Sequence, residues 1–235
     1  MPRAVTRDGP GQHWAQYGDR VDLLAWIADE RRSVADLVES LTPEQLATSS
    51  LCGAWTVHDV AAHLLMPLVT PLPKVLLAML MSGFDFDRAN VRLTAVVARR
   101  SPAQIAEELR QHAAARFKPP GMGFEAPLND LLVHQQDIRR PLGLSSTPEP
   151  DRLRTCLDFI GVRRLEGSRP SASLGGVRLE ASDVGWSAGN GLLARGPGAA
   201  ILMVLNRRPS ALVDIEGPGA ELLRERSRAT EGRRM

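Results

Sequence analysis

The chain has 235 residues, a formal net charge of +2 at pH 7 and 24% charged residues. This composition is ordinary for a soluble globular protein, and the length fits one large domain or two small ones. Because the net charge is small and no basic stripe is interleaved with aromatic residues, the sequence argues against a nucleic-acid-binding protein.

The cysteines and the apolar segments indicate a cytoplasmic protein. Cys52 and Cys156 lie outside any CxxC pair and are too few for a disulfide framework, so we expect both to be buried, reduced thiols. The first residues, MPRAVTRDGPGQHW, lack the apolar core of a signal peptide. Prolines and a lysine interrupt the apolar run from Leu64 to Met81. We therefore expect two buried helical pieces there, rather than a membrane span.

The first 145 or so residues combine helical periodicity with repeated helix-start signals. Apolar residues recur at helical spacing from Arg20 to Leu41. Thr42, Thr56 and Ser101 are each expected to be a helix N-cap, with a polar residue three positions later that can close a capping box. Helices are expected over residues 20–41, from 43 to about 49, from 57 onward, over 86–99 and over 102–116. This pattern predicts a helical bundle.

The segment PLNDLLVHQQDIRRPLG, from Pro127 to Gly143, predicts a further helix that opens at Pro127, stops before Pro141 and carries a candidate metal site. Asp130 and His134 are four residues apart and therefore lie on the same helix face. An acid and an imidazole at this spacing can bind one divalent metal ion together. His63, in WTVHDVAAHLL, is the candidate for a third ligand.

Asp137 is unusual for its position in the last turn of this expected helix. A carboxylate there opposes the helix dipole at a cost of about 0.3–1 kcal/mol. Two explanations remain open at this point. Asp137 either pairs with Arg140 or accepts a hydrogen bond from a metal-bound histidine.

Spacing alone does not single out one acid–histidine pair. Three such pairs occur: Asp59/His63, Glu108/His112 and Asp130/His134. Asp59 has a stronger role as the partner of the helix cap. On the helix after the cap, His63 lies at the edge of the apolar stripe and is expected to face inward, whereas His58 is expected to face solvent.

The pattern changes after Gly143 to that of a small α+β unit. A helix is expected over residues 151–165, followed by a boundary at GSRPSASLGG. Strands are expected at Val177–Ala181 and Leu212–Ile215, separated by a glycine-rich turn, SAGNGLLARGPG, and an apolar helix over 199–205. A last helix is expected over 218–228. The predicted domains are residues 1–165 and 166–235.

Three segments carry a resemblance to a known family: LCGAWTVHDVAAHLL, FEAPLNDLLVHQQDIRRPLG, and the stretch from SLGGVRLEASDVGW to GPGAELL. They resemble the mycothiol-dependent maleylpyruvate isomerase family, an actinobacterial branch of the DinB-like metal-binding bundles. The resemblance implies an α+β, mainly α fold: a DinB-like four-helix-type bundle followed by a small sterol-carrier-like α+β domain. It also implies that His63, Asp130 and His134 bind zinc. The family has a glutamate where this chain has the shorter Asp130, which implies a reshaped or weaker site.

The implied chemistry uses an external thiol. Two histidines and a carboxylate leave one position of a tetrahedral zinc ion open, as in catalytic sites. By resemblance, the thiol of mycothiol would be activated there and would add to an electrophilic small molecule, for isomerisation or for S-transfer, so that neither cysteine need be the nucleophile. Arg208, in NRRPSAL, matches a family arginine that could reach a substrate carboxylate. A surface ion pair is the alternative for Arg208.

Two other functions remain open. The shorter Asp130 is compatible with a non-catalytic module that binds a small molecule or a partner and retains the fold. A metal-dependent hydrolase would place water in the open position. We expect a monomer or homodimer with no nucleic-acid or membrane partner.

Overall fold

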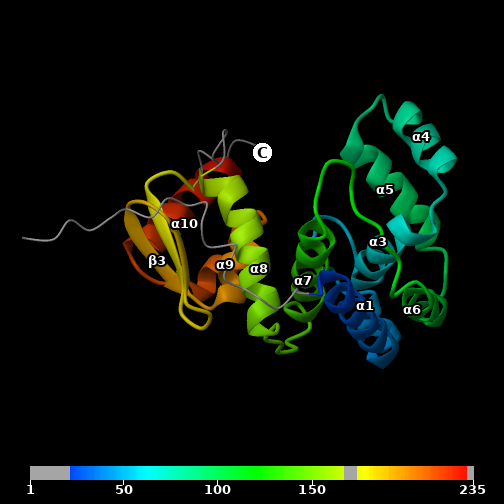
Figure 1. Ribbon diagram of the computed structural model, residues 1–235, viewed down its shortest axis with the longest axis horizontal. Coiled ribbons are helices and arrows are strands. Elements are labelled where there is room, and N and C mark those ends of the chain that lie inside the picture. Colours follow the sequence, from blue (N-terminus) through cyan, green and yellow to red (C-terminus); the bar gives the residue numbers. More distant parts are fainter. Residues whose placement is uncertain (1–21, 167–173, 232–235) are drawn as a thin grey trace, which may run out of the picture.

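The computed structural model describes residues 22–166 and 174–231, with a three-stranded sheet and its packed helices at one end of the molecule and a bundle of helices at the other (Figure 1). This arrangement confirms the expected mainly α fold with a small α+β part. The elements of the first part are α1 (Leu23–Ser40), α2 (Pro43–Leu46), α3 (Val57–Val69), α4 (Leu72–Met81), α5 (Phe86–Val97), α6 (Pro102–Gln111) and α7 (Glu125–Arg139). They are followed by α8 (Pro150–Gly161), a π-helix η2 (Val162–Glu166), β1 (Val177–Ala181), β2 (Trp186–Gly189), β3 (Leu192–Gly196), α9 (Gly198–Leu205), a 3₁₀-helix η4 (Pro209–Asp214) and α10 (Pro218–Glu231).

Local capping explains where several helices begin. Thr42, Thr56 and Ser101 each cap a helix through a complete capping box, as expected. However, α6 ends at Gln111 and not at residue 116. The buried Arg31 of α1 donates to the carbonyl oxygens of Ala113 and Ala115, at 2.7 Å each. Arg31 thus satisfies backbone groups that would otherwise continue the helix.

Helix α7 is the central element of the fold. It packs against α1 and α3 on one side and against α8 and α9 on the other, so it is buried almost all round (Figure 1). It begins at Glu125, two residues before the expected start, and ends at Arg139, before Pro141 as expected. This central position brings its side chains into contact with both parts of the chain.

The apolar run after the Thr56 cap forms two helices, but only the first is buried. The core residues of α3 include Leu64, Leu65 and Met66. In α4, by contrast, Leu72, Leu76, Leu77, Leu80 and Met81 are 55–68% exposed. The expectation of two buried pieces was therefore wrong for α4, because this helix packs mainly against α5 alone. Within the described residues, no helix is long and apolar enough to cross a membrane.

The sheet has the strand order β2-β1-β3, with β1 antiparallel to β2 and parallel to β3. The prediction of a strand at Val177–Ala181 is confirmed. The glycine-rich stretch expected to be a turn instead contains β2 and β3. Gly191 joins these strands with φ 128°, and a Cβ there would lie 2.1 Å from the carbonyl oxygen of Gly176.

The predicted strand at Leu212–Ile215 was wrong. This segment belongs largely to η4, which starts at Pro209. Leu212 and Ile215 are buried, whereas Val213 between them is 78% exposed. Their spacing of three matches the three residues per turn of a 3₁₀-helix, which places both side chains on the same face.

The connection between the two parts of the chain runs through α8, which packs against both α7 and α9. Trp186 of β2 donates to Asp158 of α8 at 2.9 Å, and its ring covers Gly161 so closely that a Cβ there would lie 2.6 Å from it. The domain division at residue 165/166 stays a prediction. The predicted boundary at GSRPSASLGG and the N-terminal segment fall largely outside the described residues.

Candidate metal centre

The first candidate ligand, His63, faces inward from α3 towards α7, as its position in the sequence predicts. Its side chain is 12% exposed. The Trp55 ring, which precedes the capped start of the helix, lies 5.0 Å from the imidazole at an interplanar angle of 41°. Trp55 therefore covers one side of His63 and shields it from water.

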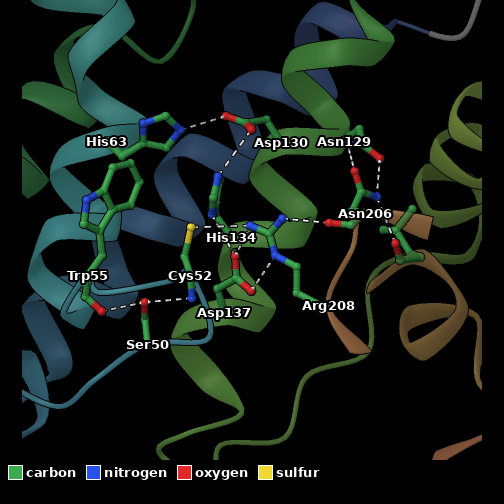
Figure 2. Close-up of polar contacts among 11 residues, drawn as sticks. Ser50, Cys52, Trp55, His63, Asn129, Asp130, His134, Asp137, Asn206 and Arg208 are labelled. Atoms are coloured by element: carbon green, nitrogen blue, oxygen red, sulfur yellow. Dashed lines mark hydrogen bonds and ion pairs between the residues drawn. The ribbon is translucent and has the colours of Figure 1, made fainter. Parts of the chain in front are cut away.

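The other two candidates, Asp130 and His134, come from α7 and meet His63 at one point (Figure 2). The Nε2 atom of His63 lies 3.7 Å from Oδ2 of Asp130. The Nε2 atom of His134 lies 3.4 Å from Oδ1 of the same carboxylate. The two imidazole rings are edge-on at 4.8 Å between centroids. One donor atom from each residue falls within 4.8 Å of the other two.

Asp137 orients the His134 ring by contacting the nitrogen that faces away from Asp130. Its Oδ2 lies 2.9 Å from Nδ1 of His134. An ionised carboxylate can only accept, so Nδ1 is the donor and Nε2 faces Asp130. Arg140 pairs with Asp214 at 2.7 Å and not with Asp137. Of the two explanations for Asp137, the pair with Arg140 is therefore wrong, and the hydrogen bond to a candidate ligand histidine is present.

Arg208 holds Asp137 in place. The Asp137 side chain is fully buried, and Arg208 donates to both of its oxygens, from Nε at 3.2 Å and from Nη2 at 2.8 Å. Arg208 also donates from Nη1 to the carbonyl oxygen of Asn206 at 2.8 Å and is 20% exposed. The expected alternative of a surface ion pair is therefore wrong. The guanidinium forms a two-point, partly buried clamp on the carboxylate.

The two histidines of the cluster have their pKa values shifted in opposite directions. Burial alone would lower the pKa of His134, but Asp130 and Asp137 raise it to about 9. Burial lowers the pKa of His63 to about 4, and Asp130 does not offset it. Burial acts to raise the pKa of Asp130, yet that side chain is 49% exposed, so the charge and hydrogen bond of His134 prevail and lower it to about 2. Without metal, Asp130 and His134 form an ion pair beside a neutral His63.

The three side chains are close enough to bind one metal ion. Zinc bonds of about 2.0–2.2 Å place neighbouring donor atoms of a tetrahedral site roughly 3.3–3.6 Å apart, close to the 3.4 Å from His134 to Oδ1 and the 3.7 Å from His63 to Oδ2 of Asp130. Two imidazole nitrogens and one carboxylate leave a fourth position open. The shorter carboxylate in place of a glutamate therefore still reaches both histidines.

A second donor set, formed by Cys52, His134 and Asp137, also lies within 4.8 Å. It fits a metal poorly, because Nδ1 of His134 is already bound by Asp137. The Arg208 Nη2 atom lies 3.5 Å from Cys52 Sγ and would repel a cation. Burial raises the pKa of the Cys52 thiol to about 11, so it stays protonated. Cys52 is only half-buried, whereas Cys156 is buried as expected.

The other histidines in the described part of the chain, and the acids spaced four residues before a histidine, have other partners. His58 is not solvent-facing as expected, because its Nε2 lies 3.0 Å from the carbonyl oxygen of Ala98. His112 contacts the backbone of Glu108 through Nδ1 at 2.9 Å, while the Glu108 side chain pairs with Arg100 at 2.7 Å.

Asp59 completes the Thr56 cap and does not join the His63 cluster. Of the three acid–histidine pairs, the structure thus brings only Asp130/His134 to a third donor among the described residues.

Sequence reasoning missed the contact that joins α7 to the end of α9 beside the cluster. Asn129, adjacent to Asp130, donates to Asn206 at 3.0 Å, and Asn206 donates back at 3.2 Å (Figure 2). No local pattern marks two asparagines 77 residues apart as partners. The pair fixes the position of the segment that carries Arg208 relative to α7.

The chain is similar to known proteins both in part of its sequence and in its fold. Residues 27–116 match the family model of the mycothiol maleylpyruvate isomerase N-terminal domain. The crystal structure of a mycothiol-dependent maleylpyruvate isomerase is similar, with a TM-score of 0.57 and 15% identity over 84% of this chain and 92% of that one. A histidine-to-alanine variant of that enzyme gives a TM-score of 0.55 at the same identity and coverage. No curated protein sequence matches the chain significantly. At 15% identity the structural likeness establishes the fold.

Proposed function

We propose that this chain, of which residues 27–116 match the family model of the mycothiol maleylpyruvate isomerase N-terminal domain, is a metal-dependent enzyme of that family. It activates a low-molecular-weight thiol, mycothiol or a similar compound, for addition to an electrophilic small molecule. The observation that carries the proposal is the convergence of His63, Asp130 and His134 from two helices, with one coordination position left open.

The ligand residues would hold a divalent metal ion, with zinc favoured by the donor types. A bound zinc ion would act as a Lewis acid that stabilises the thiolate of the co-substrate at neutral pH. Asp137 keeps the proton of His134 on Nδ1, which leaves the Nε2 lone pair for the site. The Trp55 ring excludes water beside His63. The half-exposed Asp130 marks the side from which a thiol would enter.

The thiolate would attack one carbon of an activated double bond, forming a C–S bond and leaving a single bond free to rotate. Isomerisation follows when the C–S bond breaks and the thiolate leaves unchanged. S-transfer follows when the carbanion takes a proton from water and the C–S bond remains. Neither route needs Cys52, whose pKa of about 11 keeps it a thiol.

Arg208 acts as a positioning residue in this proposal. Three of its nitrogen atoms already donate to Asp137 and to the Asn206 carbonyl group. A substrate carboxylate could therefore use little of its remaining hydrogen-bonding capacity. Its main contribution is to hold Asp137, and through it His134, in the orientation that a metal ion requires.

Metal analysis with a matched histidine control tests the proposal. The purified full-length chain should carry about one divalent metal ion, His63→Ala should lose it, and His112→Ala should retain it, because His112 lies outside the cluster. With metal bound, a low-molecular-weight thiol should be required for turnover of an electrophilic alkene. Turnover that depends on metal but not on thiol would indicate a hydrolase. A folded wild type with no metal affinity would overturn the proposal in favour of a binding module.

A further inference from the structure

A pocket of about 580 Å³ lies beside Arg208, between the loop around Ser50 and the C-terminal elements. Four arginines line it: Arg207, Arg208, Arg224 and Arg228. None of the described residues that line it is an aspartate or a glutamate. A concave surface with several positive charges and no negative ones favours an anionic ligand.

Two of the four arginines are engaged within the protein. Arg208 binds Asp137, and the Nη2 atom of Arg224 donates to the carbonyl oxygens of Leu212 and Ile215. These two guanidinium groups are fixed by their partners. They contribute positive charge to the pocket at positions that do not depend on a ligand.

The other two arginines are available to a ligand. Arg207 and Arg228 are exposed and make no ion pair with any described residue. Ser210 and Ser227 also line the pocket, and their hydroxyl groups make no hydrogen bond within the described part of the chain. Guanidinium and hydroxyl groups together supply the donors that an oxyanion accepts.

The backbone at Arg207 supports a role for its side chain. Arg207 has φ 66°, the left-handed conformation that ends α9, where glycine or asparagine is the favoured residue. It also lies close enough to Arg164 to help lower the pKa of that group, after burial. An arginine at this position is thus disfavoured by backbone conformation and by like charge, and an anionic ligand would offset the second cost.

We propose that this four-arginine pocket binds the doubly charged oxyanion group of a small molecule, a phosphoryl or a dicarboxylate group. Arg207 and Arg228 bind the anion directly, Ser210 and Ser227 donate to it, and Arg208 and Arg224 add a fixed positive field. The site uses none of the three candidate metal ligands, so its occupancy does not depend on the proposed function. Arg208 nevertheless lines the pocket and also holds Asp137. A bound anion would therefore lie next to the arginine that, through Asp137, orients His134.

Calorimetric titration of the full-length chain tests the site, with inorganic pyrophosphate and malonate as probes and sodium chloride as the reference. Wild type should bind at least one probe, and the tighter probe identifies the group as phosphoryl or dicarboxylate. The double variant Arg207→Asn/Arg228→Gln should bind it at least tenfold more weakly. A control that loses two exposed charges elsewhere, Arg32→Gln/Arg88→Gln, should bind as wild type does.

The variant His63→Ala and chelator-dialysed wild type separate this site from the metal centre. Both should retain probe binding, since the anion contacts neither the metal nor its ligands. The proposal is overturned if wild type binds neither probe, if the pocket variant binds as wild type does, or if the control loses as much affinity. Loss of binding in both metal-free samples would also overturn it, because the probe would then be bound by the metal.

Discussion

At the residue scale, the site depends on a buried carboxylate that has two partners. Asp137 is completely buried, and a buried charge without partners would cost several kcal/mol. His134 and Arg208 together compensate it, and their hydrogen bonds lower the pKa of Asp137 although burial alone would raise it. The same contacts fix the tautomer of His134. The carboxylate that opposes the helix dipole is thus held by the residues that build the site.

Replacing Asp137 tests this support. Asp137→Asn removes the negative charge behind His134 and leaves Arg208 without its carboxylate partner. We expect metal affinity to fall about 10–100-fold, as for other residues that orient a ligand histidine. Competition with a chromogenic chelator measures the change. Arg140→Gln is the control, because Arg140 pairs with Asp214 and not with the site. Equal affinity in Asp137→Asn and wild type would contradict this role.

Metal binding should displace a proton from His134. In the metal-free protein the pKa of His134 is raised to about 9, so it is protonated at pH 7, while His63, with a pKa of about 4, is neutral. A metal ion needs the unprotonated Nε2, so binding at pH 7 should release about one proton. Affinity should rise by about tenfold per pH unit from pH 7 towards 9, and then level off.

Calorimetry of metal binding in buffers with different ionisation enthalpies counts the released protons. The pH dependence of the metal affinity gives the same quantity independently. A count near zero at pH 7, with an affinity that does not change between pH 7 and 9, would show that His134 is already neutral and that its ion pair with Asp130 is weak.

At the element scale, the start of one helix and the end of another set the geometry. The complete Thr56 capping box begins α3 and sets the turn on which His63 lies. At the other side of the site, Arg207 ends α9 in the left-handed region and turns the chain so that Arg208 points back to Asp137. Capping geometry at two helix ends therefore positions His63 and the Arg208 side chain that supports Asp137.

Substituting glycine at the end of α9 should stabilise the fold. Arg207→Gly removes the cost of an L side chain at φ 66° and a like charge near Arg164. We expect the free energy of unfolding to rise by about 0.5–1 kcal/mol, measured from the urea midpoint. The same variant should bind pyrophosphate or malonate less tightly. A loss of stability would instead mean that the Arg207 side chain contributes packing to the native state.

At the scale of the whole molecule, the core and the apolar surface are separated. A buried cluster runs from α1, α3 and α6 through α7 to α8, α9 and the sheet. Helix α4 is as apolar in sequence as the buried helix α3. It lies at one end of the molecule, however, where several of its leucines are exposed (Figure 1). Apolar composition alone therefore does not identify the residues that stabilise this fold.

Two leucine-to-alanine variants test this separation. Leu109 of α6 is fully buried where α6 meets α1, whereas Leu80 of α4 is 63% exposed. Leu109→Ala should lower the free energy of unfolding by about 2–5 kcal/mol through loss of buried area and formation of a cavity. Leu80→Ala should change it by no more than about 0.5 kcal/mol. Chemical denaturation of both variants gives the comparison. Similar losses would show that α4 is covered in solution.

The sequence by itself determined the elements whose signals are local. Capping boxes at Thr42, Thr56 and Ser101 depend on residues three positions apart, so they can be recognised without tertiary information. Asp130 and His134 share a face because four residues make about one helical turn. The resemblance to a known family added the expectation that His63 joins them. Their convergence is now a geometric fact, and metal binding stays a prediction.

The tertiary structure decided whatever depends on contacts distant in sequence. The Asp137–Arg208 clamp, the Asn129–Asn206 pair and the exposure of α4 have no local signature. Strands β2 and β3 were missed because their glycines indicate turns, although the strands are stabilised by pairing with β1. A helix cap is satisfied by its own neighbours along the chain. A buried charge or a strand edge is satisfied only by the segment that the fold brings beside it.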